Sequence, residues 1–235
     1  MNLRFIGCIL LVAGTCIGAG LLALPLATAA GGFVNTSAVL FFCWIVTLCG
    51  SYYMLEVNLR LPQGTNLVSM AKATLGPAGA LITWLAYLLL LYALMAAYMA
   101  GGTDITYTYL NPFIGHLPHW IDTLLFTAVF VFIIYTGIRS VDRANRLLMI
   151  IKLSSFFFLL FLLVPHVQAP LLTRGHAPKL LSALMIIVTS FGFALIIPSL
   201  RVYLKSDVKQ LRLAIAFGSL LALFCYGTWA MAIQG

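Results

Sequence analysis

Long apolar runs alternate along this chain with short stretches that carry most of its lysines and arginines. A helix needs about 20 mainly apolar residues to cross the hydrocarbon core of a bilayer. Only helices and closed barrels satisfy their backbone polar groups there, and these runs are too long and continuous for barrel strands. We therefore expect one all-α transmembrane domain over residues 1–235, with about seven helices at 4–30, 33–59, 78–102, 120–138, 146–165, 179–200 and 211–233.

The composition excludes a soluble protein. Hydrophobic residues make up 63% of the chain and charged residues only 8%, against roughly 25% charged residues in an ordinary soluble domain. The net charge of +8 comes from clusters that flank apolar runs, so the expected partner of this charge is membrane lipid and not nucleic acid. The five cysteines have no metal-ligand spacing. With no catalytic motif either, we predict no enzyme, no metal and no cofactor.

The distribution of positive charge predicts how the chain is oriented. If the N-terminus is cytoplasmic, eleven lysines and arginines fall on the cytoplasmic side, and only Arg174 and Lys179 fall outside. The positive-inside rule then places the C-terminus in the periplasm. Residues 103–120 lack lysine and arginine and are expected to form an external loop. Residues 62–77 are expected to carry a short interfacial helix, capped by Thr65 and ended by Gly76-Pro77.

The first and sixth expected spans carry helix-weakening residues at matching positions. Residues 14–20 of the first span include three glycines and are followed by Pro25. Glycine is conformationally loose and proline lacks an N–H, so a break in the helix is expected. An offset of 174 residues aligns Thr15 with Thr189 and Gly18 with Gly192, and a proline follows in both segments. We therefore predict two discontinuous helices.

The matched breaks indicate an internal repeat, of which residues 1–167 form the first copy and residues 178–235 begin the second. Five spans separate the two starts, and an odd number inverts the topology, as in inverted-repeat secondary transporters. An opened backbone offers N–H groups and a positive helix end to a carboxylate, and carbonyls to a cation or an amine. An amino acid carries both charges. The predicted substrate-binding residues at the breaks are Thr15, Gly18, Ala19, Gly20, Ser190, Phe191, Gly192 and Phe193. The alternative is that these small residues only allow close helix packing.

At these residues the chain resembles the hydroxy and aromatic amino acid permease family, which includes tyrosine and tryptophan permeases within the amino acid, polyamine and organocation superfamily. The similar segments are residues 13–25, 55–57, 61–67, 91–98, 190–193, 197–200, 207–212 and 218–219. The resemblance implies a leucine-transporter-type fold and import of an aromatic or hydroxy amino acid with a proton, or Na⁺, across a bacterial inner membrane. Members of this family have about eleven spans, so we expect this chain to be truncated at its C-terminal end.

The resemblance also implies roles for residues away from the breaks. Tyr92 and Tyr98 lie on the helix that lines the cavity in this fold, so they are candidates for covering the substrate. Lys152 lies within the fifth expected span, and an intramembrane charge is a functional candidate by default. Lys152 and Glu56 are the expected proton-coupling residues. The alternatives are a lysine that extends to the interface and a solvated carboxylate beside Arg60.

Two functions remain open on the sequence. The first is a permease that moves an amino acid. The second is a remnant or partner subunit that does not transport alone and forms a homo-oligomer or joins a complementing C-terminal fragment.

Overall fold

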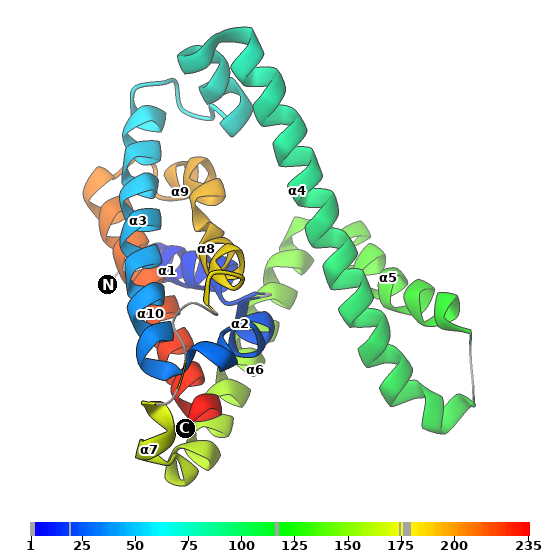
Figure 1. Ribbon diagram of the computed structural model, residues 1–235. Coiled ribbons are helices and arrows are strands. Elements are labelled where there is room, and N and C mark those ends of the chain that lie inside the picture. The colour runs from blue at the N-terminus through cyan, green and yellow to red at the C-terminus, as the bar shows by residue number, and fades with distance from the viewer. Residues whose placement is uncertain (1–2, 19, 116–117, 174, 176–179) are drawn as a thin grey trace. The chain divides into compact units, whose positions relative to one another are not determined.

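The computed structural model describes residues 3–18, 20–115, 118–173, 175 and 180–235, and every regular element among them is helical (Figure 1). This confirms the all-α prediction. The elements are α1 Leu3–Cys16, α2 Gly20–Thr28, η1 Ala29–Gly31, α3 Phe33–Leu59, α4 Leu67–Ile114, α5 His119–Tyr135, α6 Ile138–Leu163, η2 Val164–His166, α7 Ala169–Leu172, α8 Leu184–Ser190, η4 Gly192–Ile196, α9 Ile197–Tyr203 and α10 Val208–Gln234. They form two compact units, the first of Met1–Gly76 with Phe156–Gly235, the second of Pro77–Ser155.

Five stretches are long and apolar enough to cross a membrane: Phe33–Leu59, Leu67–Leu110, Leu147–His166, Leu184–Tyr203 and Val208–Gln234. The two other expected spans correspond to shorter apolar helices, Arg4–Cys16 and His119–Tyr135. The first of these is short because the expected span is divided between α1 and α2. The chain is therefore a multi-pass membrane protein.

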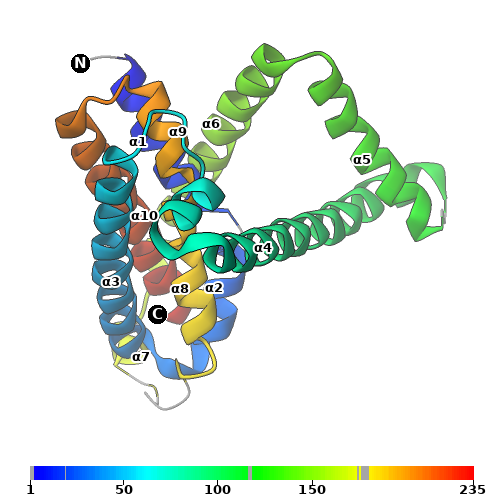
Figure 2. The ribbon, with the colours of Figure 1, turned by 90° about the horizontal axis from the view of Figure 1, so that it is seen from above.

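The core of the first unit forms where α10 packs against α1 and α3, and Figures 1 and 2 show the three helices side by side. Small residues allow this close approach. A Cβ added to Gly218 would lie 2.6 Å from Val12 Cβ and 2.8 Å from the Ile9 carbonyl oxygen. From the neighbouring helix α3, the indole N–H of Trp44 donates to Ser219 Oγ at 3.1 Å. The Gly218-Ser219 pair thus joins α10 to both neighbours.

We expect Gly218→Ala to destabilise the fold, because the added methyl group collides with α1. Overpacking of this kind costs about 1 to 3 kcal/mol. Gly227→Ala, on the same helix, is the matched control, since a Cβ there meets no atom within 4 Å. Thermal unfolding in detergent should give a lower Tm for Gly218→Ala and an unchanged or higher Tm for Gly227→Ala. Equal Tm values for the two variants would contradict the packing described.

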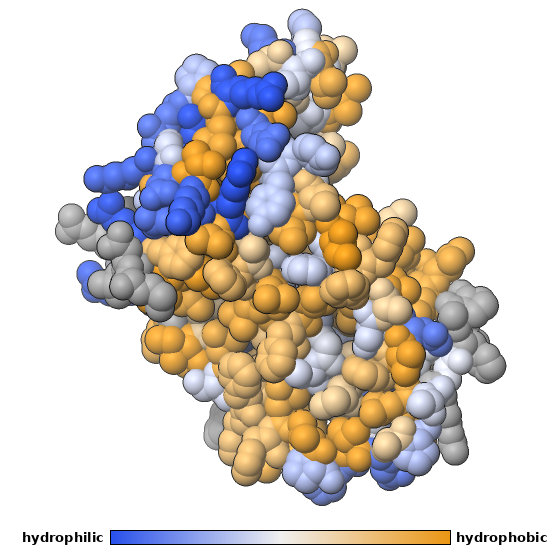
Figure 3. All heavy atoms as spheres, turned by 90° about the vertical axis from the view of Figure 1, so that its left-hand side faces the viewer, coloured by the Kyte–Doolittle hydropathy of each residue, from blue (hydrophilic) through white to orange (hydrophobic). Residues whose placement is uncertain are grey.

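Hydrophilic residues gather mainly at one end of the face that Figure 3 shows, and hydrophobic residues cover its middle. In the first unit, the C-terminal end of α3, the end of α9 and the start of α10 meet, and we call this region the polar end of the first unit. Arg201 on α9 donates to the carbonyl oxygens of Asn58 and Leu61, the latter at 3.0 Å. Its guanidinium is buried, with 8% of the residue exposed. Nothing in the sequence pattern predicts this role for Arg201.

Two local predictions need correction. Asn66 caps α4 instead of Thr65, because Asn66 Oδ1 accepts from the Ser69 N–H at 2.8 Å. The expected break at Gly76 is present, with φ 76° and ψ −167°.

The second correction concerns residues 103–120, which are expected from the sequence to form an external loop. This segment is helical up to Ile114. Threonine hydroxyls bonded four residues back satisfy carbonyls within this stretch, as Thr106 does for Gly102 at 2.8 Å.

The second unit holds α5 beside the end of α4. Thr103 and Thr123 share a hydrogen bond of 3.0 Å between their hydroxyls, and the rings of Tyr107 and His119 stack at 4.5 Å. Asp122, in the first turn of α5, is 1% exposed. Asp122 therefore lies at a helix end but is buried.

Candidate functional site

Both predicted helix breaks are present. α1 ends at Cys16, residues 17 and 18 form a turn, and α2 begins at Gly20. α8 ends at Ser190, Phe191 leaves the helical conformation with φ −102° and ψ 30°, and the 3₁₀ helix η4 follows. The last helical residues, Cys16 and Ser190, keep the 174-residue offset seen in the sequence. The discontinuous helices are therefore confirmed, while the complete leucine-transporter-type fold stays a prediction.

The two breaks lie side by side in the first unit, where α2 packs on α8 and α1 packs on η4. Gly20, the first residue of α2, marks the closest approach. A Cβ at this position would meet the Tyr226 hydroxyl and lie 2.6 Å from Ser190 Oγ. Gly20 is therefore required by space, because no side chain fits between α2 and α8.

Tyr226 on α10 joins the two breaks. Its hydroxyl donates to the Cys16 carbonyl oxygen and lies 3.1 Å from the Ser190 carbonyl oxygen, which also accepts from it. These two carbonyls belong to the last residues of α1 and α8, where a helix leaves its C=O groups without internal partners. Tyr226 is fully buried, and its ring meets the edge of the Phe191 ring at 5.4 Å and 85°. The single O–H proton of one phenol is thus shared between equivalent carbonyls of both discontinuous helices.

Tyr226 is not among the residues predicted from the sequence. The available signal was a phenol in the middle of an otherwise apolar span, because a buried tyrosine hydroxyl usually has a hydrogen-bond partner. Trp229 lies about one turn further along α10 and is likewise absent from the residues predicted from the sequence. Its indole N–H donates to the Leu21 carbonyl oxygen of α2 at 2.9 Å. Near the end of α10, Gln234 Nε2 donates to Thr28 Oγ1 at 2.9 Å, so α10 supports both ends of α2.

The structure brings together three of the eight residues predicted at the breaks. Gly20, Ser190 and Phe191 are buried around the Tyr226 ring. The Ser190 hydroxyl donates to the Ile186 carbonyl oxygen at 2.7 Å within α8. The side chain of Phe193 is also fully buried.

The other predicted residues at the breaks lie apart from this cluster. Thr15 is exposed and donates to the Leu11 carbonyl oxygen at 2.7 Å within α1. Gly192 is exposed and Gly18 is half-buried. Ala19 lies outside the residues that the structure describes.

The predicted coupling and cavity residues are distributed over both units. Glu56 lies in the first unit and forms an ion pair with Arg212 at 3.5 Å. Both side chains are about half exposed, 50% for Glu56 and 55% for Arg212, so the pair contributes only about 0 to 1 kcal/mol. Tyr92, Tyr98 and Lys152 lie in the second unit. Tyr92 and Tyr98 are 68% and 51% exposed, and Lys152 is half-buried on α6.

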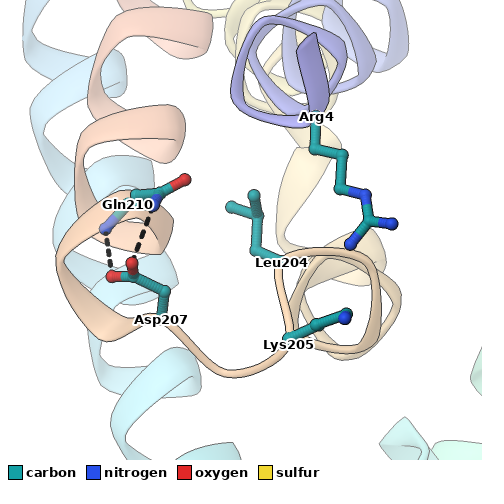
Figure 4. A pocket seen from close by; sticks show the side chains of 5 residues that line it. All are labelled: Arg4, Leu204, Lys205, Asp207 and Gln210. Atoms are coloured by element: carbon teal, nitrogen blue, oxygen red, sulfur yellow. Dashed lines mark hydrogen bonds between the residues drawn. The ribbon is translucent and has the colours of Figure 1, made fainter. Parts of the chain in front are cut away.

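A hollow of about 250 Å³ lies at the polar end of the first unit (Figure 4), lined by Arg4, Leu204, Lys205, Asp207 and Gln210. The Asp207 carboxylate is turned towards Gln210. It accepts from the backbone N–H of Gln210 at 3.0 Å and from its side-chain amide at 2.7 Å. Asp207 therefore caps the N-terminus of α10. The hollow lies among exposed charged groups and contains none of the residues at the breaks.

Comparison with known proteins gives a match along the whole chain. The model of the tryptophan/tyrosine permease family matches residues 1–235. Tyrosine-specific transport system 1 of Haemophilus influenzae is 34% identical over 234 residues, covering 99% of this chain and 58% of the relative. The tryptophan-specific transport protein of the same organism is 30% identical, covering 98% and 58%. Glutamine transporter 2 of Aliivibrio fischeri is 30% identical, covering 100% and 62%. The chain thus spans under two thirds of these relatives, and no solved structure matches it.

Proposed function

Because the chain belongs to the tryptophan/tyrosine permease family, we propose that it transports an amino acid across a bacterial inner membrane. The proposed binding site is the junction of the two discontinuous helices. The relatives named for tyrosine and tryptophan favour an aromatic substrate, and the glutamine transporter marks a polar side chain as the next candidate.

One observation carries this proposal: the C-terminal carbonyls of α1 and α8 meet beside the N-terminal end of α2. A helix C-terminus is negative and its carbonyls attract a cation, whereas an N-terminus is positive and its N–H groups attract an anion. The ammonium group of an amino acid would therefore bind at Cys16 and Ser190, and its carboxylate at the start of α2. Backbone groups would thus bind both charges without any ionised side chain.

The side chain of the substrate would extend beside Phe191 and Phe193, which lie in the second break. An aromatic substrate can make edge or offset contacts with such rings. Tyr92 and Tyr98 remain our candidates for covering this space. Thr15, Gly18, Ala19 and Gly192 would contribute through their backbone at the edges of the breaks.

We also propose that the N-terminus is cytoplasmic and the C-terminus periplasmic. Within the first unit, Arg4 and Lys205 line one hollow at the polar end, close to the start of α10 with Lys209 and Arg212. Positive residues gathered at one end favour a cytoplasmic location for that end.

Proton symport is the proposed coupling, with Lys152 and Glu56 as its residues. If Lys152 carries the proton, Lys152→Gln should abolish gradient-driven accumulation of substrate while binding at equilibrium persists. Lys209→Gln is the control, because Lys209 is an exposed cation at the start of α10. Accumulation is measured in proteoliposomes with an imposed proton gradient. Unchanged accumulation by Lys152→Gln would remove this lysine from the coupling mechanism.

Uptake by the purified chain tests the proposed function. Proteoliposomes are supplied with labelled tyrosine, tryptophan or glutamine, with and without a proton gradient, and compared with empty vesicles. Uptake above empty vesicles is the expected result. Binding without uptake would favour the alternative, in which this chain acts together with a partner chain. If the purified chain shows neither binding nor uptake, the proposal is contradicted.

A further inference from the structure

The two carbonyl oxygens assigned to the substrate ammonium already have a hydrogen-bond donor in this structure. The Tyr226 hydroxyl lies between the Cys16 and Ser190 carbonyls and is buried completely. Gly20 borders the same point so closely that a single added carbon would collide with the hydroxyl. There is therefore no room for an ammonium group on these carbonyls while the hydroxyl stays in place.

Resting on the proposed function, we propose that the Tyr226 hydroxyl is an internal ligand of the ammonium site, which the substrate ammonium displaces on binding. A phenol O–H and an ammonium N–H are both donors, so each can satisfy the same carbonyls. Ammonium is the stronger of the two, because a charged donor bonds a carbonyl more tightly than a neutral one. Tyr226 is thus a positioning residue that closes the empty site and lowers the substrate affinity.

The contacts around Tyr226 favour a local movement of its ring over a shift of the whole helix. Trp229, on the same helix, remains bonded to Leu21 of α2, and Gly218 packs directly on Val12 of α1. These contacts hold α10 in place along its length. The neighbour that would respond is Phe191, whose ring meets the edge of the Tyr226 ring. Displacement of the hydroxyl would therefore be transmitted to the ring beside the second break.

Two other roles for Tyr226 predict different results. A hydroxyl that donated to the substrate carboxylate would strengthen binding, and its removal would weaken binding. A hydroxyl that only connected α1 to α8 would change stability without changing affinity. If the substrate displaces the hydroxyl, its removal leaves the two buried carbonyls unsatisfied in the empty protein, and binding becomes tighter.

Equilibrium binding of labelled tyrosine and tryptophan to the full chain in lipid nanodiscs distinguishes these roles. Tyr226→Phe should lower Kd by about fivefold, the value of one ordinary hydrogen bond. The matched control is Tyr52→Phe, which removes another hydroxyl bonded to a backbone carbonyl, that of Arg212 at 3.2 Å, away from the breaks. This control should leave Kd unchanged. An unchanged or higher Kd for Tyr226→Phe would overturn the inference.

Competition with two analogues identifies the end of the substrate that is involved. Tyramine has the ammonium without the carboxylate, so Tyr226→Phe should improve its binding. 3-(4-Hydroxyphenyl)propionate has the carboxylate without the ammonium, so its binding should not change. The same gain for both analogues would overturn the assignment to the ammonium site.

A folding control keeps the result interpretable. Tyr226→Phe should lower Tm without ligand and show a larger rise of Tm with saturating ligand than the unmodified chain. If Tyr226→Phe does not fold, 4-fluorophenylalanine at position 226 keeps a substituent of similar size but cannot donate, and the same fall in Kd is expected. Failure of the unmodified chain and of the variants to bind any amino acid would contradict the proposed function. Binding by the unmodified chain that the variants do not tighten would contradict the present inference alone.

Discussion

Gly20→Ala is expected to weaken amino acid binding by roughly 5- to 150-fold. The new methyl group would lie 2.6 Å from Ser190 Oγ and 2.9 Å from Ser190 Cβ, and it would meet the Tyr226 hydroxyl. Neither neighbour can withdraw easily, because Ser190 is bonded to Ile186 and Tyr226 to two carbonyls. α2 would have to move away from α8, and overpacking of about 1 to 3 kcal/mol corresponds to roughly a 5- to 150-fold change in affinity.

Gly227→Ala is the matched control for this prediction as well, because a Cβ at Gly227 meets no atom within 4 Å. The measurement is the Kd of labelled tyrosine or tryptophan for each variant in nanodiscs, after Tm has shown that both are folded. An unchanged Kd for a folded Gly20→Ala variant would mean that the contact between the breaks is not part of the binding site.

Arg201→Met is expected to destabilise the first unit by about 2 to 4 kcal/mol. The guanidinium donates to the carbonyls of Asn58 and Leu61 at the C-terminal end of α3, and its Nε donates to Ser206 Oγ at 3.3 Å. A cation is favoured at the negative end of a helix. Methionine keeps an apolar side chain of similar length but removes the charged donor to these carbonyls, of which that of Asn58 still accepts from the Leu61 N–H at 3.2 Å. Hydrogen bonds from a charged group contribute about 1.5 to 3 kcal/mol each.

Arg60→Met provides the comparison for Arg201→Met, because Arg60 is exposed immediately after α3. Surface substitutions of this kind usually change stability by less than about 0.5 kcal/mol. Thermal unfolding in detergent should therefore give a clearly lower Tm for Arg201→Met and almost no change for Arg60→Met. Similar Tm values for the two variants would show that the buried network contributes little.

The sequence predicts the helix breaks correctly because their causes are local. Glycines in residues 14–20, and the glycine and proline that follow Ser190, weaken a helix whatever surrounds them. The membrane assignment is equally independent of packing, since the length and polarity of each run decide it. The 174-residue offset then identifies Cys16 and Ser190 as equivalent helix ends, and the structure places these two ends together.

The residues that satisfy the opened backbone depend on tertiary packing and are missed by sequence reasoning. Tyr226 acts on residues 36 and 210 positions away, and Arg201 acts on Asn58 across 143 positions. No local pattern specifies such partners. A cap can also shift by one residue, from the expected Thr65 to Asn66, because both side chains can accept from a helix N–H. The roles of Tyr92, Tyr98 and Lys152 remain predictions from the family resemblance.

The most direct test of the central claim is a comparison of three ligands on the unmodified chain: tyrosine, tyramine and 3-(4-hydroxyphenyl)propionate. If the carbonyls at Cys16 and Ser190 bind the ammonium and the start of α2 binds the carboxylate, loss of either charge should raise Kd by about ten- to a hundredfold. Tyrosine itself should bind saturably. Equal affinity for all three ligands, or no saturable binding of tyrosine or tryptophan, would contradict recognition of the amino acid by the two helix breaks.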